Sequence, residues 1–133
     1  ATIDFRHLPE HDPAEVDREI QAILDETARR HPQAGLDWQA LFSSPALQCS
    51  QDMPVVRALR SATLQLFGYD PGVKGYQATT DAGVLSAHMG IPTVVCGPGD
   101  LRQAHQPDEK VEVMELYKGV QIYTRVIQEL MHA

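Results

Sequence analysis

A short run of apolar residues, Ile91–Cys96, lies between a helix-like segment and a loop rich in glycine. Its length suits a strand, and apolar side chains at successive positions require both faces of that strand to be covered. The preceding segment, residues 79–90, starts with hydroxyl residues that can cap a helix and ends at Gly90. Strands of this kind belong to parallel sheets covered by helices, so the run predicts an α/β fold.

Hydrophobic periodicity predicts three more helices, over about residues 13–28, 54–67 and 113–131. Alternation of apolar and polar residues predicts strands at residues 2–6 and 36–42. In the last helix, apolar residues recur every three or four positions, which predicts that they face the core; they are Leu116, Val120, Tyr123, Ile127 and Leu130.

The character of the chain changes near residues 43–50, where Ser, Pro and Gln interrupt both patterns. We therefore divide the chain into residues 1–44, with a β-α-β order, and residues 45–133. The second part includes a short extended segment that begins at Val73, and its order is helix, strand, helix, strand, loop, helix. This order is typical of α/β layers joined by right-handed crossovers.

Composition excludes several classes of partner. The 133 residues are 43% hydrophobic and 22% charged, which suits a globular domain. A net charge of -7 argues against a nucleic-acid partner, since phosphates need a basic face. No apolar stretch is long enough to span a membrane, and Cys49 and Cys96 are too far apart in sequence for a zinc knuckle. We expect a cytoplasmic protein with reduced thiols, and a piece of a longer chain because the first residue is not Met.

Residues 96–110 form a loop of unusual composition between the apolar run and the last helix. Gly97 and Gly99 lack a Cβ, so their backbone can approach a ligand and offer N–H groups to a carboxylate or an oxyanion. Pro98 would hold the turn rigid between them. The alternative is a tight turn without a ligand. Phosphate binding is a weaker alternative because the longer glycine pattern and the lysine of a P-loop are missing.

His105 is the strongest candidate for chemistry in this loop, and its neighbours are polar. It could bind a metal or act as an acid or base, although a solvated surface histidine is the more frequent case. Asp108 and Glu109 could orient it, or they could simply favour the start of the following helix.

Two further residues are candidates for anion binding. Thr80 precedes a helix, where a hydroxyl and free backbone N–H groups can hold an anion, although capping alone explains it. Arg6 could clamp a carboxylate, or it could form a surface ion pair with a nearby acid. The sequence contains no Gly-x-Ser-x-Gly elbow, P-loop or HExxH motif, so it gives no support for nucleophilic catalysis.

Taken together, "DFRHLPEHD", residues 79–111 and the last helix resemble the C-terminal part of the acetylornithine deacetylase branch of the dinuclear-zinc amidohydrolase and peptidase family. That family also holds succinyl-diaminopimelate desuccinylase, glutamate carboxypeptidase and aminoacylase. The most specific match is "GPG" followed by "QAHQPDE". The resemblance implies that residues 1–44 are the second half of an inserted lid and dimerisation domain, and that residues 45–133 close a zinc-peptidase-like catalytic α/β domain.

The resemblance also implies roles for individual residues. His105 matches the late ligand of a site that holds two zinc ions, which cobalt can replace. Arg6, Thr80 and the Gly97, Pro98 and Gly99 loop match positions that hold the carboxylate of the substrate. The general base and the other ligands have no match here, so we expect no catalytic residue in this chain and no activity from it alone.

The implied reaction is removal of the N-acetyl group from acetylornithine in arginine biosynthesis, by a homodimer acting on a small N-acyl amino acid. Succinyl-diaminopimelate desuccinylase or carboxypeptidase specificity is one alternative. A non-catalytic domain that binds a carboxylate ligand or serves subunit association is another.

Overall fold

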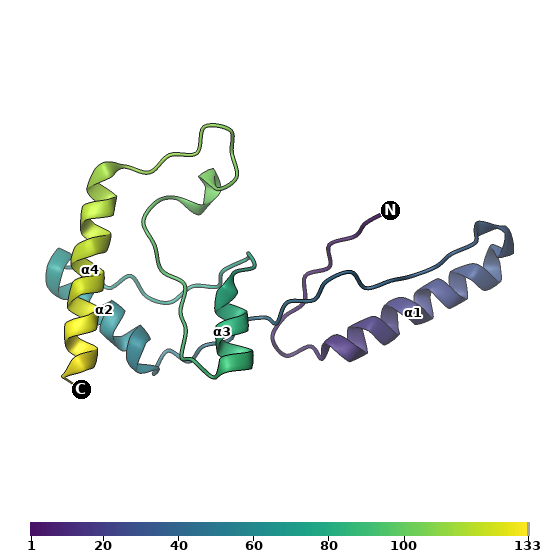
Figure 1. Cartoon of the computed structure of the whole chain (residues 1–133), viewed down its shortest axis with the longest axis horizontal. Helices are drawn as coiled ribbons and strands as arrows, with labels where there is room; N and C mark the ends of the chain where they lie inside the picture. Colours follow the sequence, from purple (N-terminus) through teal and green to yellow (C-terminus); the bar gives the residue numbers. More distant parts are fainter. Residues whose placement is uncertain (133) are drawn as a thin grey trace. The chain divides into compact units, whose positions relative to one another are not determined.

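The computed structural model describes residues 1–132 and divides the chain into two compact units, Ala1–Gln48 and Cys49–Ala133. Helices account for the regular structure of the described residues in both units (Figure 1). In chain order the elements are α1 Pro13–Arg30, the 3-10 helix η1 Pro32–Ala34, α2 Pro54–Phe67, α3 Asp81–Met89, the 3-10 helix η2 Leu101–Gln103, and α4 Val113–Met131.

The first unit is built around α1, which starts directly after its capping residue, Asp12. The Asp12 carboxylate accepts a hydrogen bond from the Ala14 N–H at 2.9 Å, and Pro13 occupies the first turn, where its missing N–H costs nothing. At the other end, Arg30 pairs with Glu26 at 2.7 Å. No residue of α1 is buried, so local hydrogen bonds and ion pairs contribute most of what holds this helix.

Glycine ends α2 and α3, as the sequence predicts. Gly68 has φ +76° and Gly90 has φ +64°, the left-handed conformation that glycine adopts without a Cβ clash. At its start, α2 follows the N-cap residue Met53, which makes no side-chain capping hydrogen bond. None of the helices within residues 1–132 is both long and apolar enough to cross a bilayer.

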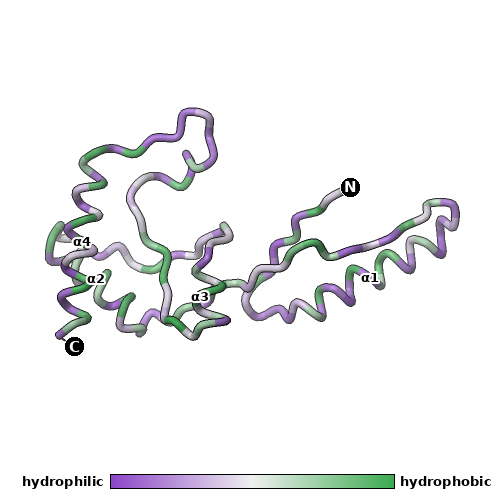
Figure 2. Tube along the Cα trace, viewed as in Figure 1, coloured by the Kyte–Doolittle hydropathy of each residue, from purple (hydrophilic) through white to green (hydrophobic). Residues whose placement is uncertain are grey.

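The predicted strands are not formed. Residues 2–6, 36–42 and 91–96 lie outside the helices, and among residues 1–132 no backbone ladder joins any two of these segments. A strand requires a neighbour that exchanges N–H and C=O bonds with it, and periodicity alone does not supply one. Apolar residues consequently occur along irregular segments as well as along helices (Figure 2). The predicted parallel sheet with its crossovers is therefore unconfirmed, and the described architecture is helical.

The second unit is held together by α2 packed against α4. Its core consists of Ala58 and Ala62 from α2 and Val126 from α4, with Leu59 and Ile122 packed against them. Ala62 is fully buried. Small side chains at these positions allow the two helix backbones to approach closely.

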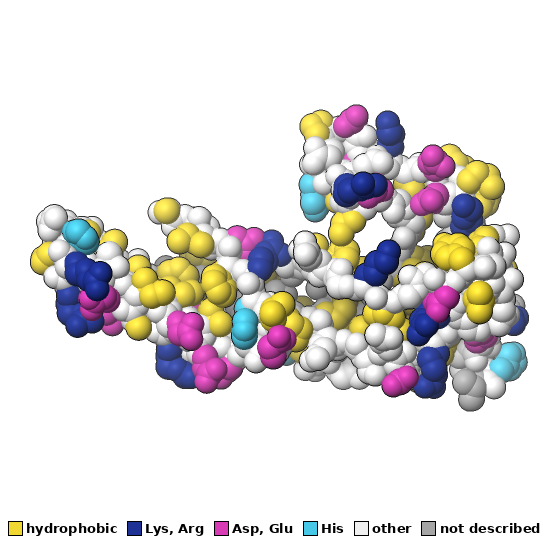
Figure 3. All heavy atoms as spheres, turned by 180° about the vertical axis from the view of Figure 1, so that it is seen from behind, with side chains coloured by type: hydrophobic (Ala, Val, Ile, Leu, Met, Phe, Trp, Pro, Cys, Tyr) yellow, Lys and Arg dark blue, Asp and Glu magenta, His cyan; other side chains and the backbone are white. Residues whose placement is uncertain are grey.

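The predicted core face of α4 is wrong. Its residues are between 39% and 64% exposed: Leu116, Val120, Tyr123, Ile127 and Leu130. The helix instead turns Ile122 and Val126 toward α2, because Ala58 and Ala62 offer a surface that those two side chains fit. Figure 3 shows apolar side chains on the visible surface of the chain. Periodicity identified an apolar side of α4 but not the side that α2 covers.

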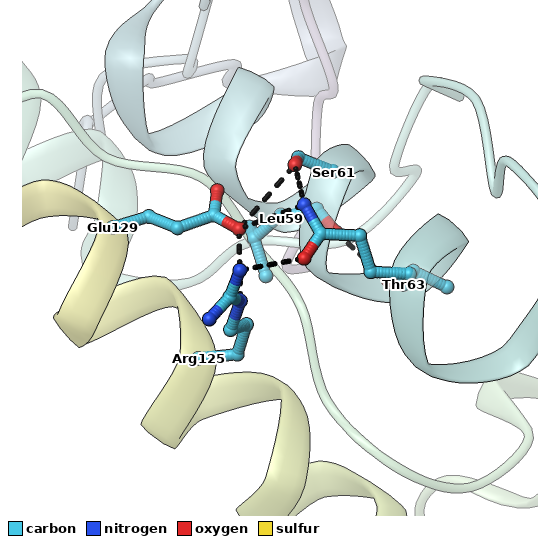
Figure 4. Close-up of polar contacts among 6 residues, drawn as sticks. Leu59, Ser61, Thr63, Arg125 and Glu129 are labelled. Atoms are coloured by element: carbon cyan, nitrogen blue, oxygen red, sulfur yellow. Dashed lines mark hydrogen bonds and ion pairs between the residues drawn. The ribbon is translucent and has the colours of Figure 1, made fainter.

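A polar network joins α2 and α4 beside this core (Figure 4). The Arg125 guanidinium donates to Gln65 Oε1 at 2.7 Å and to Glu129 Oε1 at 3.2 Å. Ser61 Oγ donates to the same Glu129 oxygen at 3.3 Å. The carboxylate and the guanidinium therefore satisfy each other at the helix contact, where an unpaired charge would be costly.

Matched truncations test which face of α4 is the core. In the 133-residue chain, Val126→Ala should lower the free energy of unfolding by about 2 kcal/mol, because it removes two buried methyl groups. Val120→Ala makes the same change at an exposed position of the same helix and should change it by less than about 0.5 kcal/mol. Urea titration measures both, and a larger loss for Val120→Ala would contradict the helix contact.

A second prediction concerns the ion pair after α2. Arg60 donates to both Asp70 carboxylate oxygens, at 3.0 and 2.5 Å, and the Gly72 N–H donates to the same carboxylate. The hydrogen bond from Arg60 lowers the pKa of Asp70 to about 2. Because this is below the unfolded value of about 3.9, the pair stabilises the fold above that pH and is lost as the pH falls toward 2.

We therefore expect Asp70→Asn to lower stability at neutral pH, with a difference that shrinks as the pH falls through about 2. Acid titration followed by circular dichroism measures the difference between the two proteins. Asp52→Asn is the control, since the Asp52 carboxylate takes part in no ion pair within residues 1–132. A difference for Asp70→Asn that persists unchanged at the acid end would contradict the prediction.

Candidate functional site

The glycine loop after Cys96 is docked on the first half of α4. Tyr123 Oη donates to the Cys96 carbonyl oxygen at 2.9 Å, and the Gly99 N–H donates to Glu115 Oε2 at 2.9 Å. Between these two bonds, Pro98 lies against the buried Gly119, where a Cβ would stand 3.9 Å from the proline Cδ. Glu115, Gly119 and Tyr123, which follow one another at intervals of about one turn of α4, therefore fix the backbone of the loop.

Glycine is required at Gly99 but not in the same way at Gly97. Gly99 has φ +94°, which strains any residue with a Cβ, and an added Cβ would lie 3.5 Å from Val111 Cγ2. At Gly97 the φ is ordinary, and an added Cβ would meet only Tyr123 Oη, at 3.9 Å. The loop conformation therefore depends on Gly99.

The loop lines a hollow of about 660 Å³. Its wall is made by Tyr76, residues 95–101, Gln103, Ala104 and residues 109–111. Partial desolvation raises the pKa of the Cys96 thiol, and partial desolvation, with Cys96 close by, raises the pKa of Tyr123, although both residues remain exposed. Both groups stay protonated at neutral pH, so the thiol is a poor nucleophile and the phenol remains a hydrogen-bond donor.

Beyond the glycine loop the chain makes a turn that presents His105. Asp100 caps η2 by accepting the Arg102 N–H at 3.0 Å, and hydrogen bonds from Arg102 lower the pKa of the Asp100 carboxyl. His105 has φ +62°, and its backbone N–H donates to Glu109 Oε2 at 2.8 Å. Residue 105 is exposed, so its imidazole is accessible to a ligand.

His105 fits as one ligand of a metal ion, because a neutral imidazole is a common zinc donor. His105 alone does not form a metal site. Among residues 1–132, no three His, Cys, Asp or Glu side chains are close enough to hold a metal ion.

The remaining predicted site residues have local partners. Thr80 Oγ1 accepts the Ala82 N–H at 3.3 Å and so caps α3, and Thr80 does not line the hollow described above. Arg6 lies in the first unit, where its guanidinium donates to Asp4 at 3.0 and 2.5 Å. These bonds agree with the capping and ion-pair alternatives, and the predicted roles of Thr80 and Arg6 with a substrate stay predictions.

Sequence reasoning missed the α4 side of this site. Glu115 and Gly119 were not among the candidate residues, and Tyr123 was assigned to the core. One signal was available, since a glycine inside a predicted helix points to close approach by another segment. The two hydrogen bonds span 16 and 27 residues of sequence, which no local pattern reveals.

Comparison with known proteins identifies the family of the chain. The chain belongs to the peptidase family M20/M25/M40, whose model matches residues 3–129. The family resemblance predicted from the sequence is confirmed at this level, while the acetylornithine deacetylase branch is not singled out. Enzymes of this family are generally metal-dependent. No solved structure matches the chain.

Named relatives carry several specificities. A putative [LysW]-lysine/[LysW]-ornithine hydrolase of Pyrococcus furiosus is 31% identical over 71% of this chain and 28% of the relative. An N-formyl-4-amino-5-aminomethyl-2-methylpyrimidine deformylase of Halalkalibacterium halodurans is 29% identical over 98% of this chain and 33% of the relative. An acetylornithine deacetylase of Myxococcus xanthus is 27% identical over 94% of this chain and 31% of the relative. The chain thus spans about a third or less of these relatives.

The docking of the loop predicts a measurable effect of one hydroxyl. Tyr123→Phe removes the donor to the Cys96 carbonyl and should cost about 1 kcal/mol locally, which is roughly fivefold faster exchange of the Gly99 amide that donates to Glu115. Tyr117→Phe is the control, because Tyr117 is an exposed tyrosine on the same helix. Equal exchange rates in the two variants, measured by NMR, would refute the docking contact.

Proposed function

We propose that this chain is part of a metal-dependent amidohydrolase, in which His105 is a metal ligand and the Gly97–Gly99 loop contacts the carboxylate of the substrate. One observation carries the proposal. An accessible imidazole and a glycine loop fixed on α4 lie within one short segment of a chain that belongs to the family. The other ligands and the general base are proposed to lie in the portion of the intact protein that these residues do not cover.

The residues of this chain have two proposed roles in the reaction, metal binding and contact with the substrate. When bound, the metal ions would polarise the scissile carbonyl and supply a hydroxide nucleophile. His105 would bind a metal through the lone pair of one ring nitrogen. The loop contributes backbone N–H groups whose direction is set by the bonds to Tyr123 and Glu115.

Glu115 sets a condition on how the loop holds a substrate. Its carboxylate already accepts the Gly99 N–H, so a substrate carboxylate that used this donor would have to displace Glu115. We propose that the Gly97 N–H is the primary donor, with Gly99 fixing the turn. This arrangement avoids placing two carboxylates on one N–H group.

The proposed substrate is an N-acylated amino acid, with N-acetylornithine as the first compound to test. The names of the relatives point to different acyl groups and amines, so the substrate panel should include [LysW]-lysine and the N-formyl pyrimidine. N-succinyl-diaminopimelate joins the panel because the sequence resemblance left that specificity as an alternative. Two zinc ions, which cobalt can replace, are the proposed cofactors. Residues 1–44 are proposed as half of a lid that forms a homodimer, in keeping with the exposed Ile3 and Phe42.

Replacing the proposed ligand tests this function. In the intact gene product, His105→Ala should weaken binding of one metal ion and lower turnover of the accepted substrate by at least about a hundredfold, since even outer partners of metal ligands cost 10- to 100-fold. His88→Ala removes another exposed histidine of the same unit and should change neither. Metal analysis and a substrate-panel assay provide the readouts.

The alternative of a non-catalytic binding or association domain makes the opposite prediction. It requires that His105→Ala retain its full metal content and that the intact protein hydrolyse none of the panel. Full turnover together with full metal content in His105→Ala would remove His105 from the site while leaving the family assignment in place.

A further inference from the structure

His105 has an unusual backbone. Its φ of +62° is the only left-handed value at a non-glycine residue among those described. This region is crowded for any side chain with a Cβ, although histidine is among the residues found there more often than most. A backbone of this kind persists only where neighbouring contacts hold it, and such residues cluster at functional sites.

The side chain of Glu109 provides the contact. Its Oε2 accepts the backbone N–H of His105 at 2.8 Å, a bond from a neutral donor to a carboxylate. Two backbone bonds close the surrounding turn, from Gln106 N–H to the Gln103 carbonyl at 3.2 Å and from Glu109 N–H to the Gln106 carbonyl at 3.1 Å. The carboxylate therefore spans the whole turn and returns to the residue with the strained φ.

We propose that Glu109 is a positioning residue, which holds His105 in the left-handed conformation and so aims its imidazole at the metal ion. This proposal rests on the proposed function, because it assumes that His105 is a ligand. The direction of a Cα–Cβ bond depends on φ, so a turn that relaxed to negative φ would point the imidazole elsewhere. Glycine would relieve the strain, yet it would remove the ligand.

A competing role for Glu109 is direct contact with substrate, since it also lines the hollow beside the glycine loop. The two roles differ in what a neutral amide can replace. The Glu109→Gln variant would keep an oxygen that accepts the His105 N–H, whereas it would lose the negative charge that a cationic substrate group would recognise. Rescue by glutamine therefore separates positioning from substrate contact.

The experiment compares Glu109→Ala, Glu109→Gln and Asp108→Ala in the intact gene product, with cobalt as the probe metal. We expect Glu109→Ala to weaken cobalt binding by about tenfold and to alter the d–d absorption of the bound ion, as the loss of a supporting partner does. Glu109→Gln should restore both values, with KM near that of the wild type. Asp108→Ala, which removes the neighbouring carboxylate, should match the wild type.

Two outcomes would overturn the positioning role. One is unchanged cobalt affinity and spectrum in Glu109→Ala, and the other is a raised KM in Glu109→Gln with normal cobalt binding, which assigns Glu109 to the substrate. His105→Gly separates this proposal from the proposed function, because it accepts φ +62° but has no imidazole. If His105→Gly binds cobalt like the wild type, His105 is not a ligand and the proposed function fails. If His105→Gly loses cobalt affinity while Glu109→Ala keeps the wild-type affinity and spectrum, only the positioning role fails.

Discussion

The contact between α2 and α4 is the interaction on which the described site depends. Ala62 is fully buried there, and Val126 closes the core from the other helix, so the rotation of α4 about its axis is fixed. With that rotation set, Gly119 and its neighbours one turn away on either side meet the glycine loop. A helix held in a different rotation would leave the Cys96 carbonyl and the Gly99 N–H without these partners.

Local signals in the sequence predicted the helices because their causes are local. Asp12 caps α1 and glycines end α2 and α3, and each needs only a few neighbouring residues. The strand at 91–96 is not confirmed, and the predicted core face of α4 is wrong. Each depends on a partner that is distant in the sequence. An apolar stripe predicts that one face of a helix is buried, but it does not predict which element of the fold packs against that face.

The same distinction applies to the candidate site. The loop composition predicted Gly97–Gly99 and His105 as candidates, because glycine lets the backbone approach a ligand and histidine can bind a metal or transfer a proton. The contacts that hold them come from Glu109, Glu115 and Tyr123, and the last two lie on a helix far along the sequence. Side-chain to backbone bonds of this kind leave no periodic trace, so only the structure reveals them.

The central claim is that His105 binds a metal ion in the intact protein. The most direct measurement is a crystal structure of the intact gene product grown with zinc, with anomalous diffraction recorded at the zinc edge. We predict an anomalous peak about 2.0–2.1 Å from a ring nitrogen of His105, with φ of that residue still positive. Zinc peaks whose ligands all come from other residues, with the His105 imidazole turned to solvent, would contradict the claim.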